Sequence, residues 1–116
     1  MVARGKECIV LNDAPLLGAV LDIFDALQQL KRGAMAAESV DFYGEYKLVL
    51  REANGLLECT NEFGGGTCKV AAIDFRAAAK NWCHAVLSEL EEHHPGLSTN
   101  PNYKRHKTYV LEVDLG

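Results

Sequence analysis

The sequence lacks any long apolar run. Only four consecutive apolar residues, Cys8 to Leu11, follow the polar start of the chain, which is too few for the core of a signal peptide. The longest mostly apolar stretch, Ala14 to Leu30, is interrupted by Asp22 and Asp25 and is too short to span a bilayer. These absences predict a protein that does not enter the membrane and remains in the cytoplasm.

Metal-binding spacings are also missing, although the chain has four cysteines and four histidines. It contains no C-x2-C, H-x3-H or HExxH pattern. The pairs Cys83-His84 and His93-His94 fall in helical sequence, where adjacent side chains point about 100° apart and chelate poorly. We therefore predict no metal site, no cofactor, and reduced thiols at all four cysteines.

Residue patterns that support catalysis are absent as well. Cys83 lies on an apolar helix stripe, where a thiol is packed and unreactive. No Asn or Asp is placed to orient a histidine beside Cys59 or Cys68. Gly64-Gly65-Gly66 is not followed by the Lys-Ser/Thr of a phosphate loop, so it is predicted to form a turn. The sequence therefore predicts a non-enzymatic protein without catalytic residues.

The sequence also lacks an excess of positive charge, because 16 acidic and 12 basic side chains give a net charge of −4. Binding to phosphates requires clustered Lys and Arg, so nucleic-acid binding is disfavoured. The one basic run, Lys104 to Lys107, is predicted to be a solvated loop and leaves nucleic-acid binding as a third alternative. We expect the acidic side chains to meet a basic protein partner, and the candidate partner-binding residues are Glu38, Asp41, Glu45, Glu58 and Glu62.

The composition of the 116 residues, 48% apolar and 24% charged, is that of one globular domain covering residues 1–116. Apolar residues recur every three to four positions from Leu16 to Leu30, which predicts a one-sided helix that ends at Lys31-Arg32-Gly33. A second apolar stripe runs from Phe75 to Leu90. It predicts a helix that begins near Asp74 and ends at His93-His94-Pro95-Gly96.

Strands are predicted where apolar and polar residues alternate and turn residues follow. Asn54-Gly55 indicates a tight hairpin. The predicted strands are Lys6–Leu11, Tyr46–Glu52, Leu56–Glu62, Thr67–Ala71 and a final one over Thr108–Leu115; Val40–Tyr43 is a candidate addition to the same meander, and Ala34–Ser39 and Leu97–Lys107 are predicted to connect elements.

The resulting order, β-α-β-β-β-α-β, predicts an α+β fold of two layers. Its mainly antiparallel sheet would carry both amphipathic helices on one face. The other face would be wet or covered by a partner, and we expect it to carry Lys47, Arg51, Glu58, Thr60, Glu62, Glu112 and Asp114.

Part of this pattern resembles small bacterial immunity proteins, the antidotes encoded beside polymorphic secreted toxins. The resemblance covers Asp41 to Gly96, and it consists of the strand Tyr43-Gly44-Glu45-Tyr46-Lys47-Leu48-Val49-Leu50, the turn Asn54-Gly55, and the helix from Ile73-Asp74-Phe75 to His94-Pro95-Gly96. It implies a cytoplasmic protein that binds and neutralises a toxin domain and catalyses no reaction. No functional residue is carried over from the family.

The main alternative is a small-molecule-binding or enzymatic α+β domain with a pocket between helix and sheet. That alternative predicts a sizeable cavity in which polar groups converge, with His84 or His106 beside an acid.

Overall fold

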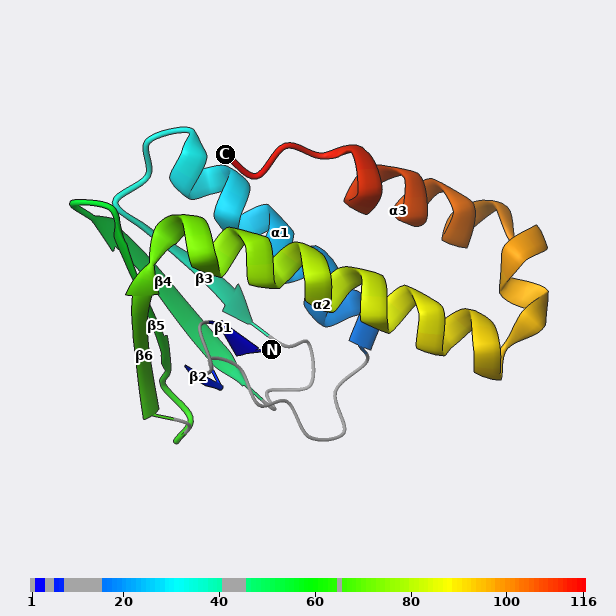
Figure 1. Cartoon of the computed structure of the whole chain (residues 1–116), viewed down its shortest axis with the longest axis horizontal. Coiled ribbons are helices and arrows are strands. Elements are labelled where there is room, and N and C mark those ends of the chain that lie inside the picture. Colours follow the sequence, from blue (N-terminus) through cyan, green and yellow to red (C-terminus); the bar gives the residue numbers. More distant parts are fainter. Residues whose placement is uncertain (1, 4–5, 8–15, 41–45, 65) are drawn as a thin grey trace.

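The chain folds around a four-stranded antiparallel sheet that is packed against helices (Figure 1). The computed structural model describes residues 2–3, 6–7, 16–40, 46–64 and 66–116. The elements in chain order are β1 (Val2–Ala3), β2 (Lys6–Glu7), α1 (Leu16–Lys31), β3 (Ala36–Val40), β4 (Lys47–Ala53), β5 (Leu56–Asn61), β6 (Gly66–Ala71), α2 (Ala72–His93), the 3-10 helix η1 (Pro95–Thr99) and α3 (Pro101–Glu112). The predicted α+β class and antiparallel sheet are confirmed.

The sheet is an open meander in which β3, β4, β5 and β6 lie side by side in sequence order. The predicted hairpin joins β4 and β5. Its two turn residues, Asn54 (φ 53°) and Gly55 (φ 78°), both adopt the left-handed conformation that a two-residue turn of type I′ requires. This turn fixes the register of the pair, so Leu50 lies opposite Cys59.

The core lies between the sheet and helices α1 and α2. A row of small and apolar residues crosses all four strands and is buried; it consists of Ala37, Leu50, Cys59 and Cys68. Helix α1 contacts β3 and β4, helix α2 contacts β5 and β6, and the two helices contact each other. Phe24 of α1 and Phe75 of α2 are fully buried in the same apolar cluster, so packing of both helices depends on one shared interior.

The C-terminal part of the chain was predicted wrongly. The predicted loop over 97–107 and the predicted final strand over 108–115 are instead η1, helix α3 and a short segment without regular secondary structure, 113–116. The side chain of Asn100 caps α3 by accepting hydrogen bonds from the backbone N–H groups of Asn102 and Tyr103, and Pro101 follows it at the first helical position. The buried positions Tyr103 and Val110 follow the helical period.

The alternation from Tyr109 to Leu115 that predicted a strand is therefore not a strand pattern, because Tyr109 and Leu111 remain 42% and 40% exposed. In Figure 1, α2 extends beyond the sheet, the chain turns at η1, and α3 runs back along α2. Glu112 and Asp114 consequently do not belong to the sheet face on which they were expected.

Three further predictions need correction. The segment 34–39 was predicted to be a connector, but Ala36–Val40 forms β3, in which Ala37 and Ser39 are buried. The sequence did not indicate this strand because the two buried side chains are small and one of them is polar. Helix α2 begins at Ala72, two residues before the expected cap Asp74, because β6 runs directly into it. Of the predicted opening strand, Lys6–Glu7 pairs with Val2–Ala3 in a separate two-stranded sheet. Residues 8–11 and 41–43 lie outside the described part of the chain.

Candidate functional site

The face of the sheet that points away from α1 and α2, here called the outer face, carries most of the candidate partner-binding residues. Strand register places Lys47, Val49 and Arg51 of β4 on this face, as the alternation in the sequence predicted. Thr60 of β5 lies opposite Val49, and its hydroxyl is 3.1 Å from that of Thr67 on β6. Charged and hydroxyl side chains therefore dominate the outer face.

The charges on the outer face are divided between its two ends. At one end, which we call the acidic end, the ammonium of Lys47 lies 3.3 Å from the carboxylate of Glu62 and 3.7 Å from that of Glu38. The side chains of Glu38 and Glu62 are 57% and 45% exposed, so both carboxylates also face solvent. One cation between two carboxylates leaves this end with net negative charge.

The opposite end, which we call the basic end, has the reverse arrangement. Glu58 on β5 lies between Arg51 on β4 and Lys69 on β6 in the strand register. Across the described outer face, three acids are thus balanced by three bases. The outer face was expected to be acidic. Its described residues instead place Glu38 and Glu62 at one end and Glu58, between two bases, at the other. Asp41 and Glu45 lie outside the described residues.

The basic run that was expected in a loop lies on α3. Lys104, Arg105 and His106 are exposed, but Lys107 forms a 2.7 Å ion pair with Glu91 of α2. Tyr103 is buried beside this pair, and burial together with Glu91 raises the pKa of its hydroxyl. Lys107 thus holds α3 against α2, and the side chains of Lys104 and Arg105 remain exposed to solvent.

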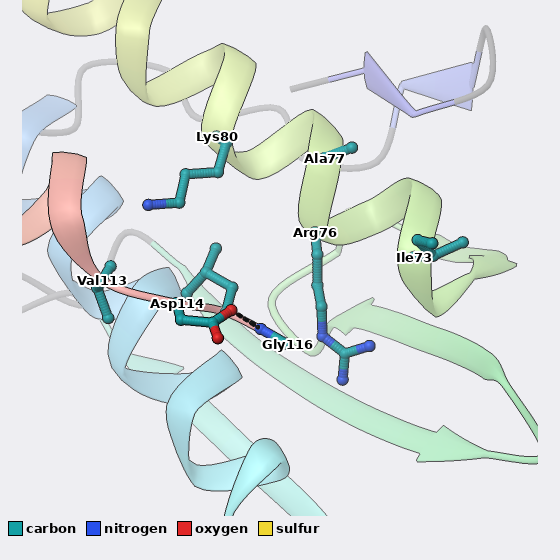
Figure 2. A pocket seen from close by; sticks show the side chains of 8 residues that line it. Ile73, Arg76, Ala77, Lys80, Val113, Asp114 and Gly116 are labelled. Carbon is teal, nitrogen blue, oxygen red and sulfur yellow. Dashed lines mark hydrogen bonds between the residues drawn. The ribbon is translucent and has the colours of Figure 1, made fainter.

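A pocket of about 280 Å³ lies between the first turns of α2 and the C-terminal segment (Figure 2). Its lining residues are Ile73, Arg76, Ala77, Lys80, Val113, Asp114, Leu115 and Gly116. The pocket of the alternative hypothesis was expected between helix and sheet and beside a histidine, but this pocket lies between a helix and the chain's last residues. Both His84 and His106 are exposed, and neither lines it. The sequence indicated no such pocket because 108–115 was taken for a strand.

An ion pair anchors the wall of this pocket to the sheet. The Nη2 group of Arg76 donates to both carboxylate oxygens of Glu52, at 2.8 and 2.7 Å. The two side chains are only 16% and 23% exposed, so solvent screens the pair less than it screens a surface ion pair. Because α2 and β4 contribute one partner each, the pair also connects helix to sheet.

Replacing Glu52 with glutamine is expected to lower the free energy of unfolding by about 2–3 kcal/mol, because the Arg76 side chain stays mostly buried without its counter-charge. Chemical denaturation of the variant measures this change. The double variant Glu52→Leu/Arg76→Leu removes both charges and is expected to be more stable than Glu52→Gln alone. Equal stability of wild type and Glu52→Gln would show that the ion pair contributes nothing.

The cysteines do not share one redox state. Cys59 and Cys83 are free and buried, whereas Cys68 is disulfide-bonded. The expectation of four reduced thiols is therefore wrong, because linear spacing does not reveal which cysteines meet in space. Cys59 and Cys68 lie opposite each other on β5 and β6. Disulfides are rare in the cytosol, so this bond counts against the cytoplasmic location, which stays a prediction.

Among the described residues, no group of three or more His, Cys, Asp or Glu side chains lies close enough together to hold a metal ion. None of the described helices is both long and apolar enough to cross a bilayer.

Comparison with known proteins finds no matching family model, no similar curated protein and no similar solved structure.

Proposed function

We propose that this chain is a non-enzymatic protein-binding domain whose outer sheet face docks a basic partner, as an immunity protein binds its toxin domain. The observation that carries the proposal is the acidic end of the outer face. There, the exposed carboxylates of Glu38 and Glu62 share a single cation, Lys47. Each carboxylate accepts more hydrogen bonds than one shared ammonium donates, so acceptors remain available for a partner's Lys or Arg.

Two further acids flank strands β3 and β4 in the sequence. Asp41 directly follows Val40, the last residue of β3, and Glu45 comes two residues before Lys47. The basic end, with Arg51 and Lys69, lies further along the same strands. A face that is negative at one end and positive at the other orients an approaching partner as well as attracting it.

Charge reversal tests this proposal. The double variant Glu38→Lys/Glu62→Lys is expected to slow association with the protein encoded by the neighbouring reading frame at least about tenfold at low salt, with a smaller effect at high salt. Stopped-flow or surface plasmon resonance measures the association rate. If the partner is a toxin, co-expression of the wild-type chain is expected to restore growth of cells that produce it, and the double variant is expected to fail.

A matched control uses Glu89→Lys/Glu92→Lys, two exposed positions on α2 with the same total change of charge. This variant is expected to bind and protect like the wild type. Circular dichroism first confirms that both variants fold. Failure of the wild-type chain to bind the neighbouring gene's product would refute the toxin-antidote proposal, and an equal loss in both variants would refute the assignment to the outer face.

A further inference from the structure

The basic end of the outer face contains a hollow of about 290 Å³ beside the β4–β5 turn. Its lining residues are Arg51, Ala53, Asn54, Leu56, Glu58 and Lys69. Three of them, Arg51, Glu58 and Lys69, form one row across β4, β5 and β6 in the strand register. Because paired strands and a tight turn supply the lining, the hollow has its shape before a partner arrives.

The two cations of this hollow have unused hydrogen-bond donors. Arg51 and Lys69 are exposed, and within the part of the chain that the structure describes neither side chain forms an ion pair or a hydrogen bond. Side chains that face each other across strands are close enough to pair, yet neither cation is ion-paired with Glu58. The acidic end differs, because Lys47 is already paired there with two carboxylates.

The hollow has a net positive charge. Glu58 is the one acid among its lining residues and is partly buried, so two cations face one carboxylate. A guanidinium has five N–H donors and an ammonium has three, which together exceed what a single carboxylate accepts. Donors therefore remain for a second carboxylate, and Arg51 can bind it through two parallel hydrogen bonds.

The shape of the hollow and its surroundings favour a carboxylate on a protein. Leu56 is 43% exposed and lies opposite Ala53, which provides an apolar surface for the carbon chain of an acidic residue. The hollow is open to solvent on a sheet face, whereas free small molecules favour pockets that enclose most of their surface. A nucleic acid is disfavoured, because its row of phosphates would also meet the carboxylates of Glu38 and Glu62.

We infer that this hollow receives a glutamate or aspartate side chain of the protein partner, whose carboxylate binds Arg51 and Lys69 while its carbon chain lies against Leu56. The inference rests on the proposed function, because the same partner would cover the acidic end. Lys47 and Arg51 are four residues apart on β4, which corresponds to about 13 Å. The partner's acid is therefore expected at this distance from the basic group that binds beside Lys47.

Nuclear magnetic resonance of the intact chain tests the hollow without the partner. The probe is an acetylated tripeptide amide with glutamate between alanine and leucine, and the same peptide with glutamine is the matched control. The glutamate peptide is expected to shift the Arg51 Nε–H signal and the backbone signals of Leu56 and Lys69 in a saturable way. The glutamine peptide and a single strand of deoxythymidine are expected not to do so.

Variants of the hollow provide the second readout, on the peptide and on the product of the neighbouring gene. Arg51→Gln/Lys69→Gln removes both cations without adding like charges and is expected to weaken binding at least about tenfold. Lys104→Gln/Arg105→Gln removes two exposed cations of α3 and is expected to bind like the wild type. Glu58→Gln is expected to strengthen binding about threefold, because it removes the acid that repels an incoming carboxylate.

The inference is overturned if the glutamine peptide shifts the same signals equally, if neither peptide shifts them, or if the nucleic acid shifts them and the peptides do not. Weaker binding by Glu58→Gln also overturns it, because the occupant would then be a cation. If the wild-type chain does not bind the neighbouring gene's product, the proposed function fails and the peptide titration decides the ligand of the hollow. If it binds and Arg51→Gln/Lys69→Gln binds equally well, the proposed function stands and the inference fails.

Discussion

Replacing Phe75 with alanine is expected to lower the free energy of unfolding by about 3–5 kcal/mol. Phe75 is fully buried at the start of α2, in the cluster that also contains Phe24 of α1 and the inward residues of the sheet. Removing the ring loses the apolar surface that it buries and leaves a cavity that the sheet and two helices cannot easily close. Urea denaturation followed by circular dichroism measures the change.

The matched control lies two residues earlier on the same helical turn. Ile73 is 73% exposed, so Ile73→Ala is expected to change stability by less than about 0.5 kcal/mol. A loss at Ile73 as large as the loss at Phe75 would contradict the packing described for α2. The loss expected for Phe75→Ala is a large part of the free energy of unfolding of a typical domain, about 5–15 kcal/mol. The Phe75 variant is therefore expected to be only marginally folded.

The Cys59 thiol is expected to react with iodoacetamide roughly a thousandfold more slowly than an exposed cysteine at pH 8 while the protein stays folded. Burial raises the pKa of Cys59 to about 12, because the charged thiolate would lose its hydration in the core. The thiolate is the reactive form, and at pH 8 almost none of it is present in the folded state. Mass spectrometry of timed samples measures the rate at each cysteine.

Asn81→Cys provides an exposed thiol on α2 for comparison, and unfolding in guanidinium is expected to make Cys59 react at the ordinary rate. The same pKa shift sets a direction for stability. Between about pH 8.5, where an unfolded cysteine ionises, and pH 12, the unfolded chain binds fewer protons than the folded chain. Stability is therefore expected to fall as the pH rises through this window. Rapid labelling of Cys59 in the folded protein would show that the thiol is accessible.

The outer face and the pocket are on different parts of the molecule. The outer face belongs to the sheet, whereas the pocket belongs to α2 and the C-terminal segment. Glu52 is the residue closest to linking them, because it lies on β4 and holds Arg76 of the pocket wall. Its neighbour on the same strand, Arg51, belongs to the basic end of the outer face. Experiments that alter one surface are thus expected to leave the other unchanged, except at this strand.

The sequence by itself determined the elements whose side chains repeat with a clear period. Helix α1, the strands β4 and β5, and the Asn54-Gly55 turn between them were all predicted within a few residues. In these segments the buried positions and the local conformational preferences agree, because one face of each element is apolar and the turn residues tolerate left-handed backbone. The division of β4 into Tyr46, Leu48 and Leu50 inside and Lys47 and Arg51 outside follows from the same alternation.

Tertiary structure decided the rest. From Thr108 to Leu115 the alternating pattern favoured a strand, and the contacts of Tyr103 and Val110 with the helices made most of it a helix. Tertiary structure also decided that Arg76 pairs with Glu52, that Glu38 and Glu62 share Lys47, and that Cys68 forms a disulfide. These pairings join residues far apart in the chain, and a linear pattern records which side chains a segment buries but not which other segment they will contact.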